Sequence, residues 1–309
     1  MPQRSRNRRR SRHKKKSQFP SRRLTVTLVL VAVLILAAIA ALYHRQPVAT
    51  LATQSKHPRP QITTKQQPPP QPVIIDTTPK ARFALVIDDM GYHQKVGDAL
   101  LHLPLALSFA FLPHAPHTKS QLQLAKSRGR DILLHLPMEA TDKKWDPGKG
   151  SLFLAMNRQK IHRTILEDLA AVPGAIGINN HMGSRFTENE TAMRDFLGVL
   201  KQQRLFFLDS LTSPNSVGLK IAAELNIPTL HRNVFLDNQQ DKEIIKKQLT
   251  NLIFLARKQG IAIGIAHPHQ ATLDALRDFL RHPDKSVVMV SISSILGDQE
   301  PIAKRNVKQ

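Results

Sequence analysis

Short apolar segments recur along the chain from position 83 to position 291, and polar residues or glycines separate them. Runs rich in Val, Ile, Leu and Phe are typical of strands that are buried on both faces. In most intervals the apolar residues return every three or four positions, as on one face of a helix, most clearly within 161–169, 193–200 and 244–256. The pattern therefore predicts strands that alternate with helices. The expected strands span residues 83–87, 106–112, 131–135, 175–179, 205–209, 228–231, 261–266 and 287–291.

Strands joined by helices pair in parallel, because a crossover connection returns the chain to the same end of the sheet. Seven or eight such units lie between Arg82 and Leu296, a stretch of about 215 residues that one hydrophobic core can accommodate. We therefore expect one α/β domain, built as a (β/α)7–8 barrel rather than as an open doubly wound sheet.

Six of the apolar segments run directly into an Asp or a His. A strand that ends where a polar loop begins would explain any single case, but loops more often begin with Gly, Asn, Ser or Pro. In a parallel barrel the carboxyl ends of the strands share one rim, and active sites form there. The segments therefore predict one chemical site assembled from distant parts of the chain. They read FALVIDD, RDILLH, AIGINNH, LFFLD, IPTLH and GIAIGIAH.

Two adjacent carboxylates, Asp88 and Asp89, close the first of these segments. Neighbouring side chains on a strand point to opposite faces, so we expect the turn at Gly91 to reorient one of the two. A carboxylate pair can then divide its work, with one group binding a metal and the other taking a proton from water. A helix cap beside a surface acid is the structural alternative for the same two residues.

Two histidines close neighbouring predicted strands. His135 is followed by Pro137, which argues against a helix that would place Glu139 on the same face, so we expect His135 at the strand end and Glu139 in the loop. His181 lies in the polar cluster NNHMGS. The chain has no Cys, so a metal site must use His, Asp or Glu. Together with Asp89, the two histidines supply the three ligands of a catalytic zinc-type site that keeps one position open.

Other polar residues at the predicted strand ends are candidates for supporting roles. His267 could protonate a leaving group, and Asp209 or Arg232 could orient a catalytic carboxylate or imidazole. For Asp209 and Arg232 a purely structural role stays open, and His269 also fits a loop residue ahead of a helix that begins near Ala271. The supporting candidates are Glu139, Asn180, Ser184, Asp209, Arg232 and His269.

The ends of the chain differ in composition from this domain. Residues 1–23 carry eleven Lys or Arg and no acid, and the 19 residues of 24–42 carry no charge. An apolar stretch of this length can span a bilayer, and a basic flank on its N-terminal side favours the cytoplasm. We therefore expect a cytoplasmic tail at 1–23, a single transmembrane segment or signal anchor at 24–42, a Pro/Gln-rich linker at 43–80, the folded domain at 81–297 and a polar tail at 298–309. The domain would lie on the periplasmic side of the inner membrane.

Two alternatives remain for the N-terminal region. Ala38-Ile39-Ala40 offers a small-residue cleavage site, so a periplasmic protein released from a signal peptide is the second localisation. The basic tail could also bind nucleic acid, but its position before an apolar run favours a role in membrane topology. About half of the formal net charge of +22 belongs to this tail. The basic composition is therefore mostly not a property of the folded domain, and a nucleic-acid partner is not expected.

Seven short motifs occur in one order across residues 82–296, and in this order the chain resembles the divergent polysaccharide deacetylases, a branch of the NodB-type carbohydrate esterases. The resemblance implies a distorted (β/α) barrel and deacetylation of an acetylated carbohydrate. It also implies that Asp88 is the catalytic base, that Asp89 is a metal ligand and that His267 is the catalytic acid. The motifs are IDDMG, LSFAFLPHAP, LLHLPME, NNHMGSRFT, FFLDS, HRNVFLDN and IGIAHPH.

The chain departs from the NodB-type pattern at two points. It has no His-x-x-x-His motif, since Glu139 stands four residues after His135, and Arg185 stands four residues after His181. Either Glu139 replaces the second imidazole, or the two histidines each supply one ligand from separate strands, which is the arrangement we expect. Zinc is the expected metal, and nickel, cobalt or manganese remains compatible with such a site. The Arg-Pro-Pro-Tyr motif of the family is also absent, which leaves the orientation of the base open.

The resemblance leads to two hypotheses of function. The first is metal-dependent deacetylation of an N-acetylated, or O-acetylated, envelope polysaccharide such as a peptidoglycan-type glycan. The second is a glycan- or envelope-binding module that keeps the barrel without turnover, because the metal motifs depart from the family pattern. Three aromatic residues near the predicted rim, Tyr92, Phe111 and Trp145, are candidates for stacking on sugar rings. Packing inside the domain is the more common role for such residues.

Overall fold

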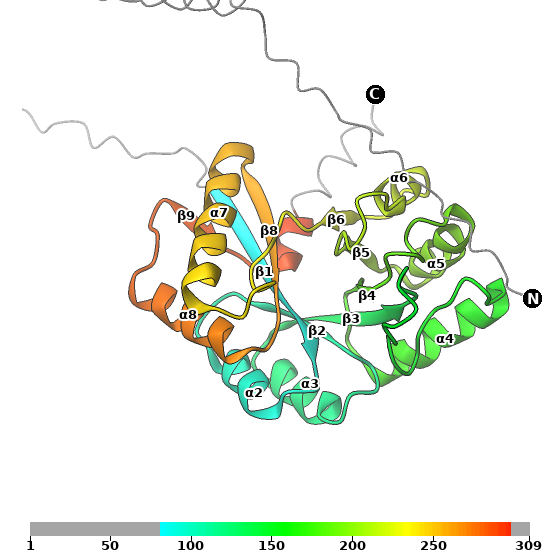
Figure 1. Cartoon of the computed structure of the whole chain (residues 1–309), viewed down its shortest axis with the longest axis horizontal. Helices are drawn as coiled ribbons and strands as arrows, with labels where there is room; N and C mark the ends of the chain where they lie inside the picture. The colour runs from blue at the N-terminus through cyan, green and yellow to red at the C-terminus, as the bar shows by residue number, and fades with distance from the viewer. Residues whose placement is uncertain (1–80, 298–309) are drawn as a thin grey trace, which may run out of the picture. The chain divides into compact units, whose positions relative to one another are not determined.

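The computed structural model describes residues 81–297, where parallel strands form a curved sheet with helices along its outer side (Figure 1). The strands are β1 (Ala81–Met90), β2 (Ser108–Phe111), β3 (Asp131–Met138), β4 (Gly177–Met182), β5 (Phe206–Asp209), β6 (Thr229–His231), β7 (Val234–Phe235), β8 (Ile261–Ala266) and β9 (Val287–Met289). The helices are α2 (Gln94–His102), α3 (Thr118–Ser127), α4 (Arg158–Ala171), α5 (Glu190–Gln203), α6 (Gly218–Glu224), α7 (Lys242–Gln259) and α8 (Gln270–Arg281).

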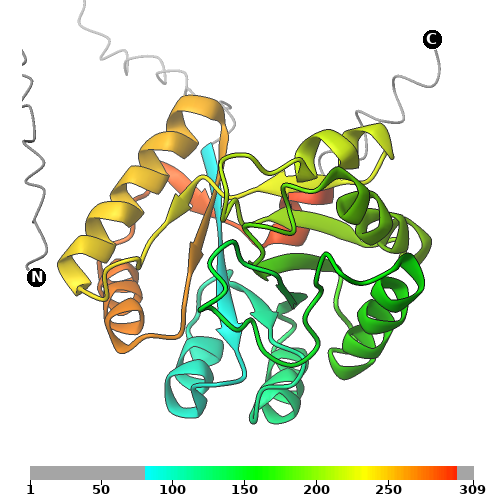
Figure 2. The same cartoon turned by 45° about the vertical axis from the view of Figure 1, so that its right-hand side comes forward.

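The strand order shows that the sheet curls into an open barrel. Its strands follow the order β6-β5-β4-β3-β2-β1-β8-β7, and β9 adds beside the first residues of β1. β6 and β7 stand at opposite ends of this order, yet only Arg232 and Asn233 separate them in the sequence. The sheet must therefore bend until its two edges come close together (Figure 2). This arrangement confirms the predicted parallel α/β architecture in part, because the sheet is a half-barrel: within residues 81–297 no hydrogen bonds join its edge strands β6 and β7.

Alternating residues of the strands face two separate apolar cores. On β1, Phe83 and Leu85 belong to the core shared with the helices, whereas Ala84 and Val86 belong to the core inside the barrel. Because both faces are covered, the strands read as continuous apolar runs. The inner core consists of Ala84, Val86, Ala110, Leu133, Phe206, Leu208, Leu230, Ile263, Ile265, Ile292 and Ile295.

The C-terminal residues of the domain close the end of the barrel where the strands begin. Ile292 is fully buried, and its backbone N–H donates to the Ser108 hydroxyl at the start of β2 (3.0 Å). The carboxylate of Asp131, the first residue of β3, accepts hydrogen bonds from the backbone N–H and the hydroxyl of Ser293 (2.8 and 3.0 Å). The opposite end of the barrel, where the strands finish, is therefore the end available for chemistry.

The predicted elements agree with the structure except in their bounds and in one strand. β1, β3 and β4 each continue a few residues further than expected, so Asp88, Asp89 and His181 lie within strands rather than after them. β7 was not predicted, because two residues are too few to show a period.

The predicted tail, apolar segment and linker at 1–80 and the C-terminal tail at 298–309 lie outside the described residues. Within residues 81–297, no helix is both long enough and apolar enough to cross a membrane.

Candidate active site

A backbone irregularity at the end of β1 turns both carboxylates toward the same place. The pairing of β1 with β2 shifts between Ile87 and Met90, and Asp89 adopts a left-handed conformation with φ of 53°. An L-residue rarely takes this conformation, and a bulge of this kind re-aims the side chains around it. The reorientation expected at Gly91 therefore occurs at Asp89 itself. Gly91, with φ of 111°, then carries the chain away past Thr118 and Ala115, where a Cβ atom would clash.

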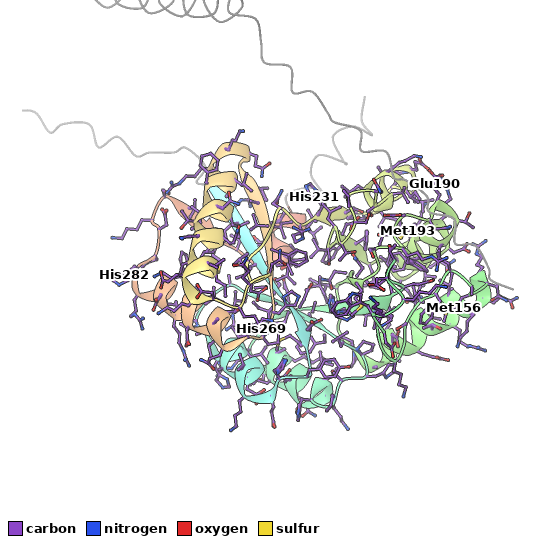
Figure 3. All side chains as sticks on the ribbon, in the orientation of Figure 1. Met156, Glu190, Met193, His231, His269 and His282 are labelled. Carbon is purple, nitrogen blue, oxygen red and sulfur yellow. The ribbon has the colours of Figure 1, made fainter. Side chains whose placement is uncertain are left out.

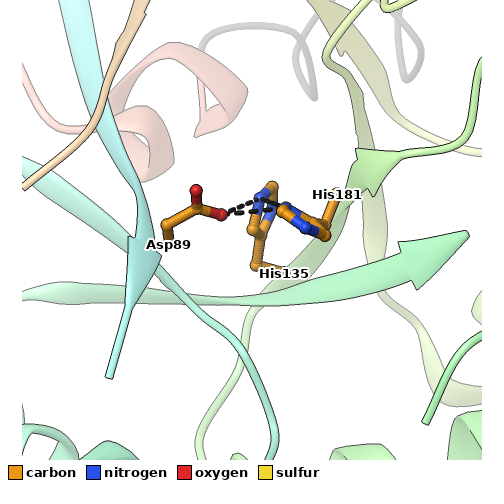
Figure 4. A group of neighbouring side chains, drawn as sticks. All are labelled: Asp89, His135 and His181. Carbon is orange, nitrogen blue, oxygen red and sulfur yellow. Dashed lines mark hydrogen bonds and ion pairs between the residues drawn. The ribbon is translucent and has the colours of Figure 1, made fainter. Parts of the chain in front are cut away.

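Three side chains from three strands meet at the carboxyl end of the barrel (Figure 4). Asp89 Oδ1 lies 3.1 Å from Nε2 of His135 on β3 and 2.9 Å from Nδ1 of His181 on β4. The two imidazole nitrogens are 3.2 Å apart. The structure thus brings together the three residues that the sequence predicts as metal ligands.

Asn179 fixes the orientation of the His135 ring. The Asn179 amide nitrogen donates to Asp88 Oδ1 (2.8 Å), because a carboxylate oxygen accepts, so the amide oxygen faces His135 Nδ1 at 2.9 Å. His135 Nδ1 must then carry the proton of that hydrogen bond, which leaves a lone pair on Nε2. In metal sites a ligating His is usually oriented by such a partner on its other nitrogen. The same amide therefore orients both the proposed base and one proposed ligand.

The atoms at this point fit a bound divalent cation. Asp89 Oδ1 is buried and has no hydrogen-bond partner in this geometry, and a neutral His135 in the tautomer set by Asn179 offers it only a lone pair. Acceptors this close together need a proton or a cation between them. Ligand atoms at about 2.0–2.2 Å from one tetrahedral ion stand roughly 3.3–3.6 Å apart, close to the separations seen here. Two nitrogens and one carboxylate oxygen also match the ligands that zinc accepts.

The ionisation of these residues reflects burial and their mutual contacts. Burial opposes ionisation of Asp89, but contacts with His135 and His181 hold its pKa well below the usual range. Burial raises the pKa of Asp88, and His135 and His267, when they are protonated, only partly offset this effect. Burial alone would lower the pKa of His135, whereas the charges of Asp88 and Asp89 raise it. The cluster therefore attracts positive charge.

His267 approaches the same region from the end of β8. Its Nδ1 donates to Asp237 Oδ1 at 2.8 Å, and Asp237 Oδ2 accepts from the His267 backbone N–H (2.6 Å) and the Thr272 hydroxyl (2.7 Å). Burial would lower the pKa of His267, but the Asp237 carboxylate raises it to about 9. The ring also stacks on Phe235, with centroids 6.0 Å apart. Asp237 thus holds the ring in place and keeps it protonated at neutral pH.

Asp237 is a site residue that the sequence reasoning missed. It follows the apolar residues of β7 in the segment VFLD, so the same pattern of an apolar run ending in an acid would have found it. Its carboxylate also lies with His267 and His269 in a second group with the composition of a metal site. Three hydrogen bonds already reach the two Asp237 oxygens, and we therefore interpret this residue as orienting His267.

The three candidates nearest to the cluster hold loops in place. Glu139 lies just after β3 as predicted, and its oxygens contact Arg185 (2.7 Å) and the Leu154 N–H (2.7 Å), so they face away from the metal position. Asn180 accepts from the Ser210 N–H at 2.9 Å and donates to a backbone carbonyl of its own strand. The Ser184 hydroxyl accepts from the Thr141 N–H at 3.0 Å. The structure therefore does not bring Glu139 into the ligand group.

The remaining candidates lie beside the site. Asp209 is buried and accepts from the Leu211 N–H (2.9 Å) and the Ser216 hydroxyl (2.6 Å), which shapes the loop after β5. Arg232 donates to the carbonyls of Ser210 and Leu211 and lies 3.8 Å from the centre of the Phe235 ring. His269 stands immediately before α8, and Figure 3 shows it at the opposite end of that helix from His282.

A parallel barrel with an Asp-His-His cluster and an adjacent buried carboxylate at its carboxyl end has the architecture expected of a carbohydrate deacetylase. The model of the divergent polysaccharide deacetylase family matches residues 85–296, and the chain belongs to this family.

The chain is also similar to two bacterial proteins and to one solved structure. The uncharacterised protein YibQ of Escherichia coli K12 is 36% identical over 219 residues, which is 71% of this chain and 68% of that protein. An uncharacterised protein of Haemophilus influenzae is 36% identical over 225 residues, 72% of this chain and 79% of that protein. The crystal structure of ATU2773 from Agrobacterium tumefaciens C58 matches with a TM-score of 0.68 at 24% identity, covering 71% of this chain and 90% of that one. That likeness shows the fold.

Proposed function

We propose that the domain removes acetyl groups from an N-acetylated carbohydrate of the cell envelope with the help of a divalent metal, for which zinc is the expected ion. The observation that carries the proposal is the meeting of Asp89, His135 and His181, whose facing atoms lie within 3.2 Å of one another, with Asp88 Oδ2 only 3.7 Å from His135 Nε2. Family membership supports the same reaction class. An O-acetylated glycan as the substrate, and nickel, cobalt or manganese as the metal, are also compatible with the proposed reaction.

Asp88 is the proposed base. Asn179 occupies its Oδ1 atom, whereas Oδ2 lies 3.7 Å from His135 Nε2 and so faces the metal position. The carboxylate is buried, and its raised pKa makes it a stronger proton acceptor than an exposed Asp. In the proposed reaction Asp88 Oδ2 takes a proton from water as the water oxygen attacks the acetyl carbon. Asp89, His135 and His181 would hold a cation that polarises the acetyl carbonyl and lowers the pKa of water.

His267 is the proposed acid. Its Nδ1 proton is committed to Asp237, and at neutral pH the ring is protonated on both nitrogens because its pKa is raised to about 9. Nε2 can therefore donate a proton to the amide nitrogen as the C–N bond breaks, and an amine and acetate leave. The charge interactions of His267 with Asp88 and Asp89 support a position for the proposed acid near the proposed base.

The decisive experiment measures metal content and acetate release together. The purified protein should bind one divalent ion per chain and release acetate from N-acetylated oligosaccharides. His181→Ala removes one ligand at the rim, where the side chain is partly exposed, so it should lose metal and activity while the fold is retained. Full metal occupancy of that variant would show that the ligand set is wrong.

A glycan-binding module without turnover is the second candidate, because the His-x-x-x-His and Arg-Pro-Pro-Tyr motifs are absent. Protein loaded with zinc, nickel or cobalt that binds glycans but releases no acetate from N- or O-acetylated substrates would favour the module.

The proposal extends to the location of the domain. The basic residues 1–23 followed by the uncharged residues 24–42 support export, with the domain held at the outer face of the inner membrane or released after cleavage.

A further inference from the structure

Beside the proposed metal centre, the loop from β3 to α4 displays two aromatic side chains on a small cavity. Trp145 is 64% exposed and Phe153 is 37% exposed, and both line a cavity of about 310 Å³. Single exposed aromatic residues are common on protein surfaces, but two that share one cavity at the active end of a barrel indicate a binding site. The cavity is lined by Glu139, Ala140, Lys143, Trp145, Asp146, Pro147 and Phe153.

The cavity lies close to the metal centre. Glu139, which lines it, follows β3 directly, and His135 lies four residues earlier on the same strand. At about 3.3 Å per residue, the two positions are roughly 13 Å apart along the strand. Arg185, which pairs with Glu139, also lies four residues after His181. One extended ligand can therefore reach the cavity and the proposed metal centre together.

The loop that carries Trp145 is held in a defined shape. The Lys144 N–H donates to the Asp142 carboxylate (3.0 Å), and the Trp145 N–H donates to the Asp142 carbonyl (3.1 Å). Further along the loop, the Gly148 N–H donates to the Asp146 carboxylate (2.9 Å). Such turns restrict the loop before a ligand arrives, so less conformational entropy is lost on binding.

The far end of the loop is fastened to β3. Leu152 forms backbone hydrogen bonds with the carbonyl of Pro137 and the N–H of Glu139, both at 2.9 Å. The Leu154 N–H donates to Glu139 Oε2 at 2.7 Å. Phe153 stands between these anchored residues, so its ring is presented from a fixed backbone beside Trp145.

We propose that this cavity is a saccharide subsite that binds a further sugar ring of the polymer, more than one unit along from the ring whose acetyl group reaches the metal centre. This inference rests on the proposed function, and it adds which part of the substrate the domain would recognise apart from the acetyl group. A pyranose ring has apolar C–H faces and hydroxyl edges. Trp145 and Phe153 match the faces, while Lys143 and Asp146 supply a donor and an acceptor for hydroxyl groups at the edge. The subsite predicts that the enzyme prefers oligosaccharides to a single acetylated sugar.

The test uses the fact that Trp145 is the only tryptophan of the chain. The full-length protein is titrated with a tetramer of β-1,4-linked N-acetylglucosamine while tryptophan emission is recorded. A saturable change in emission supports the subsite, because no other tryptophan can contribute. Emission that stays constant while the same tetramer is deacetylated would overturn the inference and leave the proposed function intact. A saturable change without acetate release would retain the subsite and count against the proposed function.

Kinetics on matched variants provide the second readout. Trp145→Ala should raise KM for the tetramer by roughly three- to tenfold, the scale of one aromatic stacking contact, and Trp145→Phe should restore part of the loss. Phe254→Ala is the control, because Phe254 is similarly exposed (59%) but lies on α7. Equal KM values for Trp145→Ala and the control would overturn the inference, and so would a loss confined to kcat.

Discussion

Asn179 offers the sharpest test of how the site is built. It is fully buried and makes two short hydrogen bonds, to His135 Nδ1 (2.9 Å) and Asp88 Oδ1 (2.8 Å). Asn179→Ala removes the group that fixes the tautomer and orientation of the His135 ring. Loss of such a partner typically lowers metal affinity by about 10- to 100-fold, which corresponds to about 1.4–2.7 kcal/mol.

The neighbouring Asn180 provides a matched control. It is also buried, and its amide bonds to the Ser210 N–H and the Met182 carbonyl (2.9 and 2.7 Å), without contact with His135. Each alanine variant loses at least two buried hydrogen bonds, so both should be destabilised by a similar amount, about 2 kcal/mol. Only Asn179→Ala should, in addition, bind zinc more weakly by about 10- to 100-fold.

Competition titrations with a chromogenic zinc chelator measure the affinity, and urea unfolding of the metal-free proteins measures the stability. Wild-type zinc affinity in Asn179→Ala would refute the role assigned to the amide. Equal losses of affinity in the two variants would refute it as well, since general destabilisation would then explain the effect.

The sequence predicts the charged residues of this site but not the contacts that orient them. Asp88, Asp89, His135 and His181 follow apolar runs, and a parallel barrel places the ends of such runs on one rim. Asn179 was missed because a neutral amide next to an apolar run carries no signal of its own. Its role depends on the register that pairs it with His135 across β3 and β4, which the sequence pattern does not specify.

The geometry at two other positions also depends on tertiary structure. The left-handed backbone of Asp89 is imposed by the bulge between β1 and β2, and a non-glycine residue gives no local indication of it. Asp237 follows a strand of only two residues, which is stable because it pairs with β8. The fold class could be predicted because it depends on many repeated units, whereas these details depend on single contacts.

Three further predictions follow from the proposed roles. Asp88→Asn should keep the metal and release acetate roughly a hundredfold or more slowly, as expected when a base is removed. Asp89→Asn should lose both the metal and the activity, so the measured metal content distinguishes the two variants. Asp237→Asn should lower the pKa of His267 from about 9, so the alkaline limb of the kcat/KM profile should move to lower pH, and an unchanged limb would count against His267 as the acid. A reporter fused after residue 80 should be active only outside the cytoplasm. Activity in the cytoplasm would contradict both the predicted membrane anchor and the predicted signal peptide.

The closure of the barrel by its own C-terminal residues has a consequence for how the chain folds. Ala81 at the start of β1 pairs with Val287 of β9, and the Ile292 backbone bonds to Ser108 from a position 184 residues later in the sequence. Contacts of such long range are slow to form, because the intervening chain must be ordered first. The first strand therefore lacks two of its partners, β8 and β9, until almost the whole domain has been synthesised. The domain therefore cannot complete its native contacts before the segment that contains β9 and Ile292 has been made.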